Sequence, residues 1–395
     1  MPLIRVFSWK MWTIFTFSIV LVAGGCSYFY FRTDSAQAVA LCKTSTNKPL
    51  CYSSTIEGIL RVDGIPAAFD ALAIAYDTDS DFAGTCHAVT HELGKAAYDE
   101  FEKIGKTELS SKASYCGYGF YHGFMDALYL ETNDMEKARL FCAYVGENVP
   151  HPPSAEFAEG SCYHGIGHGV TDGTDPRAWG NVMAIVEPGL ALCSKVAATN
   201  EEWQMRCASG VFNALGNMYL DPKFKLHSDA DPYALCRTGP FSSVERKACY
   251  NQMNTEAAAR GNNNLAAIVG FTNAIQNPGY RSTALQEAVS FYVQVVKNEQ
   301  KLLTIEDARV CELPTDELKH SCVSGLIGGI MEFGSPGQQY KEALQFCEAE
   351  GFPLDLRQHC FSAVQANSKE YFTANVMRQI CARVPREYQN AVCKS

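Results

Sequence analysis

The spacing of the cysteines constrains this chain more than any other feature of its sequence. Seventeen cysteines are spread over 395 residues, and from residue 42 onward most of them come in closely spaced pairs. Each pair encloses a short polar or proline-containing stretch, which is typical of two helices joined by a turn and held by a disulfide. The predicted hairpin pairs are Cys42–Cys51, Cys142–Cys162, Cys193–Cys207, Cys236–Cys249, Cys311–Cys322, Cys347–Cys360 and Cys381–Cys393.

Two further cysteines, Cys86 and Cys116, have no partner at the usual distance. Pairing them with each other leaves Cys26 as the one unmatched cysteine of the chain. The sequence contains no C-x-x-C motif, so the commonest zinc-finger, thioredoxin-like and haem-attachment patterns are missing. Cysteines in such number and spacing therefore indicate disulfides formed in an oxidising compartment.

The residues that follow the second cysteine of each pair also repeat. The third and seventh positions are mostly small, as in Gly119 and Gly123 or Gly165 and Gly169. Small residues four apart on a helix let a neighbouring helix approach closely. The second cysteines recur 42 to 46 residues apart between 116 and 249, and 33 to 38 apart after 322. Such periods are typical of stacked helical hairpins, and the gap from 249 to 322 leaves room for one hairpin without cysteines, around 268–296.

Strand patterns are weak, because alternation with a period of two is scarce and no Asn-Gly turn occurs. We therefore predict an all-α fold: disulfide-clipped helical-hairpin repeats that form an α-solenoid, after an N-terminal transmembrane or signal segment. The predicted regions are an anchor or signal segment at 1–38, a histidine-rich repeat region at 39–180, and a cysteine-paired repeat region at 181–395.

The first 38 residues have the properties of an export segment. Arg5 and Lys10 precede an uncharged run over 11–31, which is long enough to span a bilayer. Three alternatives remain: an uncleaved anchor, lipidation at Cys26, or cleavage by a signal peptidase near Ala38. All three place the folded part outside the cytoplasm. We predict a membrane-anchored chain that faces the periplasm or the cell exterior.

The composition narrows the choice of partner. A net charge of −10, without any cluster of Lys and Arg, argues against nucleic acid. The apolar content of 47% is typical of a folded protein with a sizeable core. We expect the membrane to be a partner through the N-terminal segment, and a protein or small molecule to bind the repeat surface.

Six of the nine histidines fall in the stretch from Cys86 to Asp172, and five of them stand at helical spacing. Side chains four residues apart lie on one face of a helix, so this spacing aligns His87 with His91 and His164 with His168. In the frame of the repeat, the second, sixth and tenth positions after the second cysteine form one column. The column is richest in metal-ligating residues at three neighbouring helices and fades later to Ser324, Gly328, Glu332 and to Ser362, Ala366, Glu370. The predicted metal ligands are His87, His91, His122, Asp126, His164, His168 and Asp172.

Imidazole and carboxylate ligands suit zinc, copper or iron, and the sequence does not choose among them. The competing interpretation is that these histidines fill polar gaps in a tightly packed core, bonded to carbonyls and tyrosines. Glu92, next to His91, is a candidate general base, and Tyr118, which heads one column, is a candidate catalytic residue. The pattern is not H-E-x-x-H, so a zincin is excluded.

The sequence thus favours a membrane-anchored, extracytoplasmic, metal-binding repeat protein. The first hypothesis is a metalloenzyme that performs metal-activated hydrolysis or copper- or iron-dependent oxidoreduction. The alternatives are a protein-binding scaffold, and metal sequestration or delivery without catalysis.

Overall fold

The computed structural model describes residues 35–105, 107–150, 154–227 and 230–393. Over these residues the secondary structure is helical and contains no strand, which confirms the predicted all-α class. The predicted membrane-spanning or signal run at 11–31, and Cys26 within it, lie outside the described residues. A search of the described helices finds none that is both long and apolar enough to cross a membrane.

The helices form successive hairpins, and nine of the described α-helices begin at a side chain that caps the backbone. Asp134, Asn181 and Asn200 each accept a hydrogen bond from a backbone N–H of the first turn, which satisfies a group that the helix itself leaves unpaired. In the N-terminal half the helices are α2 (Ser35–Cys42), α3 (Lys48–Asp63), α4 (Ile65–Thr78), α5 (Cys86–Ile104), α6 (Gly119–Thr132), α7 (Met135–Asn148), α8 (Ser154–Asp172), α9 (Val182–Val196) and α10 (Glu201–Leu220).

The C-terminal half continues in the same manner with shorter helices between the long ones. They are α11 (Ala234–Thr238), α12 (Ser243–Gln252), α13 (Asn254–Arg260), α14 (Leu265–Asn273), α15 (Pro278–Asn298), α16 (Ile305–Val310), α17 (Asp316–Phe333), α18 (Gln339–Glu348), α19 (Leu354–Tyr371), α20 (Ala374–Arg383) and α21 (Arg386–Val392). Four short 3-10 helices join them: η1 (Ser80–Phe82), η2 (Ser111–Ser114), η3 (Pro176–Ala178) and η4 (Pro222–Phe224). The pair α14 and α15 is the predicted hairpin without cysteines.

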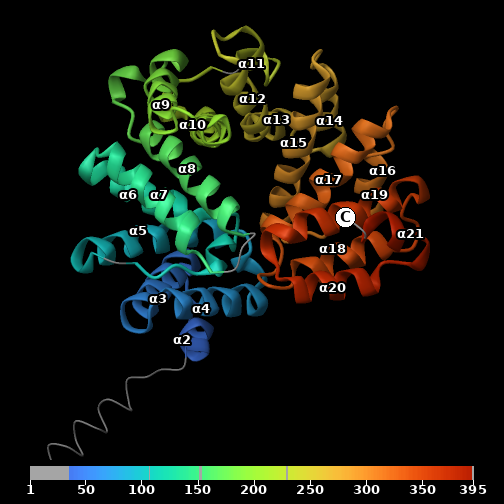
Figure 1. The fold of residues 1–395 in the computed structure, drawn as a ribbon, viewed down its shortest axis with the longest axis horizontal. Coiled ribbons are helices and arrows are strands. Elements are labelled where there is room, and N and C mark those ends of the chain that lie inside the picture. Colours follow the sequence, from blue (N-terminus) through green and yellow to red (C-terminus); the bar gives the residue numbers. More distant parts are fainter. Residues whose placement is uncertain (1–34, 106, 151–153, 228–229, 394–395) are drawn as a thin grey trace, which may run out of the picture.

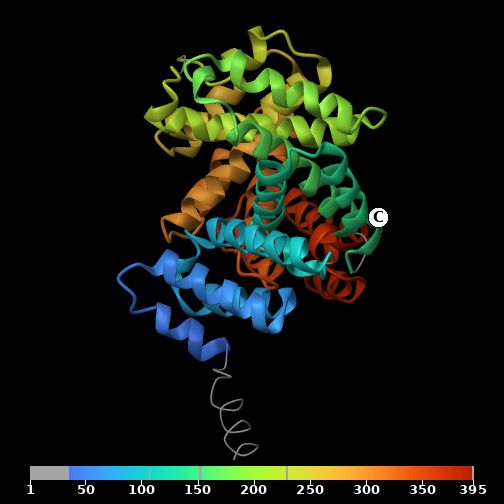
Figure 2. The ribbon, with the colours of Figure 1, turned by 90° about the vertical axis from the view of Figure 1, so that its left-hand side faces the viewer.

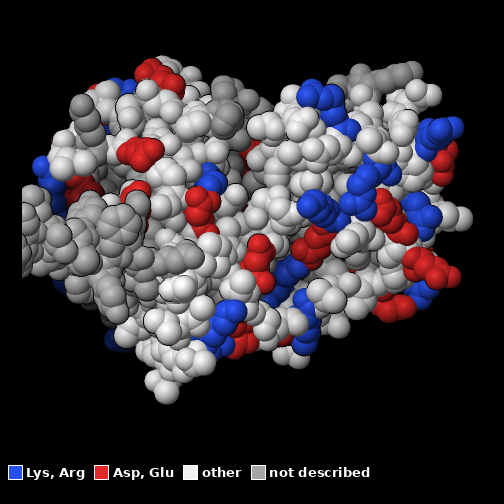
Figure 3. Space-filling view, turned by 90° about the horizontal axis from the view of Figure 1, so that it is seen from below, with Lys and Arg blue, Asp and Glu red and all other residues white. Residues whose placement is uncertain are grey.

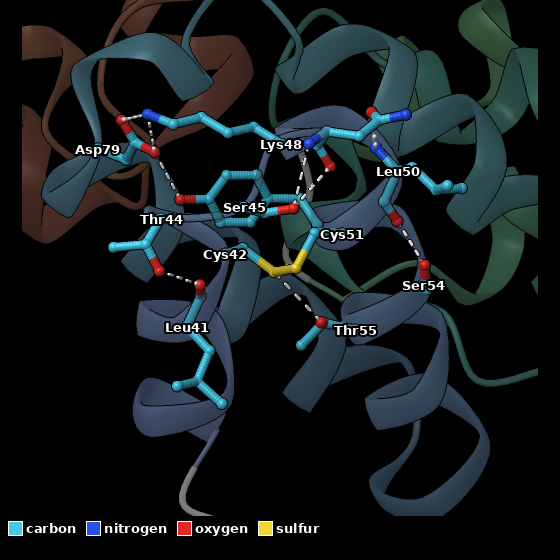
Figure 4. Close-up of a disulfide and its surroundings, with 12 residues drawn as sticks. Leu41, Cys42, Thr44, Ser45, Lys48, Leu50, Cys51, Ser54, Thr55 and Asp79 are labelled. Carbon is cyan, nitrogen blue, oxygen red and sulfur yellow. Dashed lines mark hydrogen bonds and ion pairs between the residues drawn. A yellow bond between two sulfur atoms is a disulfide. The ribbon is translucent and has the colours of Figure 1, made fainter.

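All eight predicted disulfides are confirmed, including the bridge from Cys86 to Cys116. Figure 4 shows the first of them, Cys42–Cys51, which ties α2 to the start of α3. Beside it, Asp79 accepts a hydrogen bond from the Tyr52 hydroxyl at 2.7 Å and pairs with Lys48 at 3.1 Å. Closing loops this short stabilises each hairpin by roughly 3 kcal/mol in the chain-entropy account. The disulfides place the folded chain in an oxidising environment outside the cytoplasm.

The long helices that follow the second cysteines stand side by side in chain order. Each of α5, α6, α8, α10, α12, α15, α17 and α19 contacts the next. Figures 1 and 2 show how this series turns round the molecule and brings the C-terminal helices back to α4 and α8. The first and last parts are joined by hydrogen bonds from Tyr76 to the Phe333 carbonyl and from Ser335 to Asp77. The sequence pattern did not predict this meeting of the two ends.

Buried apolar residues form two large clusters along this series of helices. The first extends from Val39 to Ala284, and the second from Leu265 to Val392. The boundary that we drew at residue 180 follows the distribution of histidines and stays a prediction. On the face shown in Figure 3, Lys and Arg are interspersed with Asp and Glu, so that face carries no field of a single sign.

Candidate metal centre

Glycine contacts bring α5, α6 and α8 unusually close together. A Cβ atom at Gly123 would lie 1.9 Å from the His91 carbonyl oxygen, and one at Gly165 would lie 2.7 Å from the Tyr121 carbonyl oxygen. Neither position can accept a larger residue without moving a helix. These are the small positions that the repeat predicted. Their consequence is that side chains on three helices meet in one place.

Three imidazoles from α5 and α6 share a single point. His91 Nε2 lies 3.2 Å from His87 Nε2 and 3.2 Å from His122 Nδ1. His87 Nδ1 lies 2.7 Å from the Cys116 carbonyl oxygen, which can only accept, so His87 carries its proton on Nδ1 and presents a lone pair to His91. Without a metal, His91 Nε2 would have one proton to donate to two neighbours, His87 Nε2 and His122 Nδ1.

This arrangement fits a metal ion. Nitrogens bound about 2.0–2.1 Å from one tetrahedral ion lie about 3.3 Å apart, close to the separations within the cluster. Burial lowers the pKa values of His87, His91 and His122, which keeps the imidazoles in the neutral form that binds metals. The ligand atoms of these three residues all lie within 4.8 Å of one another.

His168 joins the cluster from α8. Its ring centroid is 5.7 Å from that of His91 and 5.4 Å from that of His122. On its other side, His168 Nδ1 lies 2.9 Å from Asp172 Oδ2 and 3.7 Å from Asp126 Oδ1. Both aspartates were predicted as ligands, and they belong to a group that could hold an ion, so that role stays a prediction. Both lie at Nδ1 of His168, where a carboxylate can also orient an imidazole and leave Nε2 for a metal.

Asp126 and Asp172 also stabilise positive charge on or beside His168. Burial alone lowers the pKa of His168, but hydrogen bonding and charge from Asp126 and Asp172 outweigh it and raise the pKa to about 10. A proton or a metal ion can supply the charge that the carboxylates stabilise. The same three residues form a second group whose ligand atoms lie within 4.8 Å of one another.

His164, the fifth imidazole, lies over His122. The two rings are stacked with centroids 4.7 Å apart and planes 20° apart. His164 Nε2 is buried and has no hydrogen-bond partner among the described residues. Burial and the neighbouring His168 lower the pKa of His164 to about 3, so it is neutral. The structure thus brings together all five histidines that the sequence singled out.

The backbone between α5 and α6 is strained where it serves the cluster. Cys116, Gly117 and Tyr118 all have positive φ, at 56°, 71° and 57°. For a residue other than glycine this costs about 1–2 kcal/mol. The disulfide from Cys86 holds the segment in place, and the result is a Cys116 carbonyl aimed at His87. Strain of this kind gathers at functional sites.

The cluster borders a partly open cavity of about 640 Å³. His87, His122 and His164 line it on one side. Further lining residues come from the second, sixth and tenth positions after the second cysteine in later repeats, which is the column that contains the histidines. The column residues that line the cavity beyond α8 are Asn213, Asn217, Thr255, Ser324, Gly328, Glu332, Ala366 and Glu370.

Three carboxyl groups stand in the wall built by α15, α17 and α19. Burial, together with the neighbouring acids, raises the pKa of Glu332 to about 8. Burial also raises the pKa of Glu370 to about 7 and that of Glu287, although the charge of Arg206 opposes both shifts. Glu332 lines the cavity but is deeply buried, so desolvation is the largest cause of its raised pKa. In the sequence, Glu332 and Glu370 stand at the end of a fading column, and Glu287 lies outside that column.

Of the two predicted catalytic residues, one lines the cavity and the other does not. Glu92 does not reach the cavity: its side chain is 48% exposed and pairs with Lys95 at 3.0 Å. The helix turns it outward because it follows His91 directly. Tyr118 does line the cavity, with its ring 6.2 Å from that of Tyr371. Glu332, in the opposite wall, approaches His87: its Oε1, like His87 Nδ1, lies within 3.3 Å of the Cβ position of Gly117.

Comparison of the chain with protein-family models, with curated proteins and with solved structures finds no match. The geometry of the cluster and its cavity therefore carries the functional argument. The chain is an all-helical protein with many disulfides and with two groups of His and Asp residues that could hold a metal ion.

Proposed function

We propose that this chain is an extracytoplasmic metalloenzyme, and that it performs hydrolysis in the cavity beside the histidine cluster. The observation that carries the proposal is the double role of the imidazoles. His87 and His122 belong to the group whose nitrogens surround one point, and both also line the cavity. A metal held there would be next to any molecule in the cavity. An N-terminal anchor that keeps the chain at a membrane belongs to the same proposal.

One ion fits the arrangement best. His87, His91 and His122 would be its ligands, and His168 a fourth through Nε2, because Asp126 and Asp172 occupy the Nδ1 side. The all-nitrogen set suits zinc, copper or iron. When bound, such an ion supplies Lewis-acid chemistry and lowers the pKa of adjacent water.

The carboxyl groups opposite the cluster favour hydrolysis over electron transfer. A pKa near neutrality lets a carboxyl group both give and take a proton, and Glu332 and Glu370 have values of about 8 and about 7. Glu332 stands next to His87 across Gly117 and is the group placed to move a proton to or from a substrate. Tyr118, between the cluster and Glu370, is placed to orient a bound molecule.

Metal sequestration is the second candidate, and one observation favours it. Three imidazoles surround one point, and His168 as a fourth ligand would fill the coordination shell of an ion without leaving a position for substrate. Both functions require that the protein bind a metal, so elemental analysis tests both. Only the enzyme also requires that a small ligand in the cavity change the coordination of the metal.

The test is metal analysis of the purified full-length protein after dialysis against zinc, copper(II) and iron(II) in turn. We expect about one ion per chain for the preferred metal. Loading with cobalt(II) would then report on the site through its visible spectrum, which depends on coordination number. A four-nitrogen spectrum that acetate and azide leave unchanged would favour sequestration, whereas a shift would favour the enzyme. Less than a tenth of an ion per chain under all conditions would contradict both functions.

A further inference from the structure

The lining of the cavity shows what kind of molecule it can hold. No leucine, isoleucine, valine or methionine occurs among the described residues that line it. Most ligand sites have predominantly apolar linings with a few polar groups, so this cavity is unusual. Side-chain amides recur instead, on five of the helices and from both halves of the chain. They are Asn213, Asn217, Gln252, Asn254, Gln286, Gln294 and Asn367.

Several of these amides are already oriented by contacts within the wall. Asn213 Nδ2 donates to Gln252 Oε1 at 3.1 Å, and Asn367 Nδ2 donates to the Ala363 carbonyl at 2.8 Å. Each of these contacts uses one polar group of an amide and leaves others for a ligand. An amide presents a donor and an acceptor side by side, which matches a hydroxyl group, since a hydroxyl also donates and accepts.

Aromatic side chains share the lining with the amides. Phe157, Phe291 and Phe333 line the cavity together with Tyr118 and Tyr371. A ring face is a good surface for C–H groups but satisfies no hydroxyl. A lining that combines aromatic rings and amides therefore suits a molecule with apolar faces and hydroxyl-bearing edges, which is the form of a pyranose ring.

Charge in the cavity excludes strongly anionic ligands. Three glutamates line the cavity, but Arg206 is the only Lys or Arg among the described lining residues. Arg206 also pairs with Glu202 at 2.9 Å, which offsets part of its charge. In the metal-free protein, a phosphate or sulfate group would meet three acidic side chains and one guanidinium that is already paired, and this costs free energy in a confined site.

We propose that this cavity binds a neutral, hydroxyl-rich ligand, namely a short oligosaccharide. That the oligosaccharide is a substrate rests on the proposed function, but its binding does not require the metal. The experiments can therefore find sugar binding without metal binding, or metal binding without sugar binding. The cavity volume of about 640 Å³ is in the range of sites for small molecules, so the ligand is a few sugar rings and not a polymer domain.

Isothermal titration calorimetry of the full-length protein tests the proposal, with the metal-loaded and the metal-free forms measured separately. The neutral probes are maltotriose, cellotriose and chitotriose. Triglycine and glucose 6-phosphate serve as the peptide and anionic probes. We expect at least one trisaccharide to bind with a Kd of about 1 mM or lower in the metal-free form, and at least tenfold more tightly than either of the other two probes.

The variant Asn213→Leu with Asn367→Leu removes an amide from each of two walls and should weaken that trisaccharide at least tenfold. Asn148→Leu is the control, because Asn148 is an exposed residue on α7 outside the cavity. If the double variant does not fold, Asn217→Leu replaces it, since Asn217 is exposed and its loss disturbs no packing. Binding of none of the three trisaccharides to folded wild-type protein, or equal binding of triglycine, would overturn the proposal even if the metal is present.

Discussion

Two walls of one cavity place acidic residues at the same position of the repeat and use them differently. The tenth residue after the second cysteine is Asp126 or Asp172 in the histidine wall, and Glu332 or Glu370 in the opposite wall. Neither aspartate lines the cavity, whereas both glutamates do.

The residue one turn earlier explains the difference between the walls. In α6 and α8 it is a histidine, and Asp126 and Asp172 lie behind the ring of His168. In α17 and α19 it is Gly328 or Ala366, which leaves the longer glutamate side chain facing open space. The tenth position therefore orients a metal ligand in the histidine wall and faces a bound molecule in the opposite wall. Each prediction below compares a change in one wall with a matched change in the other.

The largest effect is expected from the imidazoles themselves. The variant His91→Ala with His122→Ala removes two of the three nitrogens around the shared point, so metal binding should fall by at least a thousandfold. Elemental analysis after dialysis gives the readout. The matched variant in the other wall is Glu332→Gln with Glu370→Gln, which should keep about one ion per chain. Equal metal loss in both variants would mean that the imidazoles are structural.

A smaller effect should follow from the aspartates. Asp172→Asn keeps the size of the side chain but weakens the hold on His168 Nδ1, now 2.9 Å away. Loss of a partner of this kind typically lowers metal affinity 10- to 100-fold. Competition with a chelator of known affinity measures the change. Glu332→Gln should alter the affinity less than twofold. An Asp172→Asn variant with unchanged affinity would place His168 outside the coordination shell.

Replacing a glycine by alanine in either wall should lower stability to a similar extent, but only one of the two changes should lower metal affinity. A Cβ at Gly123 would lie 1.9 Å from the His91 carbonyl oxygen, and one at Gly325 would lie 2.5 Å from the Gln286 carbonyl oxygen. Either change to alanine forces two helices apart and should cost about 1–3 kcal/mol of unfolding free energy. Chemical denaturation measures that cost. Metal affinity should fall in Gly123→Ala alone, because only α5 and α6 carry the shared nitrogens.

Much of this molecule could be predicted from local spacing. Short separation predicts seven of the eight disulfides, and Cys86 and Cys116 pair because they are left over. Small residues four apart mark the close helix contacts. The five histidines share a helix face in the sequence and meet in the structure. These features depend on residues within one hairpin or on neighbouring hairpins, where the repeat frame is reliable.

What the sequence did not reveal depends on how the series of helices closes. The role of Glu332 and Glu370 as a wall opposite the histidines follows from the return of α17 and α19 to the N-terminal helices. Small rotations between successive hairpins add up to that return, and no single spacing encodes them. The outward direction of Glu92 could have been inferred, because a residue next to His91 on a helix points about 100° away from it.

The smallest expected effect concerns the pH dependence of stability. The pKa of Glu332 is about 8 in the folded protein and about 4.5 for an ordinary glutamate, because burial and the carboxyl groups of Glu287 and Glu370 disfavour its charge. The folded state thus holds this proton more tightly than the unfolded state does. The resulting stabilisation is complete below about pH 4.5 and is lost as the pH rises through about 8.

Glu332→Gln cannot ionise, so its unfolding free energy should decline less between pH 6 and pH 9 than that of the wild type. The difference should be on the order of 1 kcal/mol per pH unit or less, because water in the cavity screens part of the charge. Denaturant unfolding at several pH values measures it. Glu92→Gln is the control and should follow the wild type, since Glu92 is exposed. Parallel curves for Glu332→Gln and the wild type would show that Glu332 is ionised in the folded protein at neutral pH. The carboxyl wall would then attract cations and could not donate a proton.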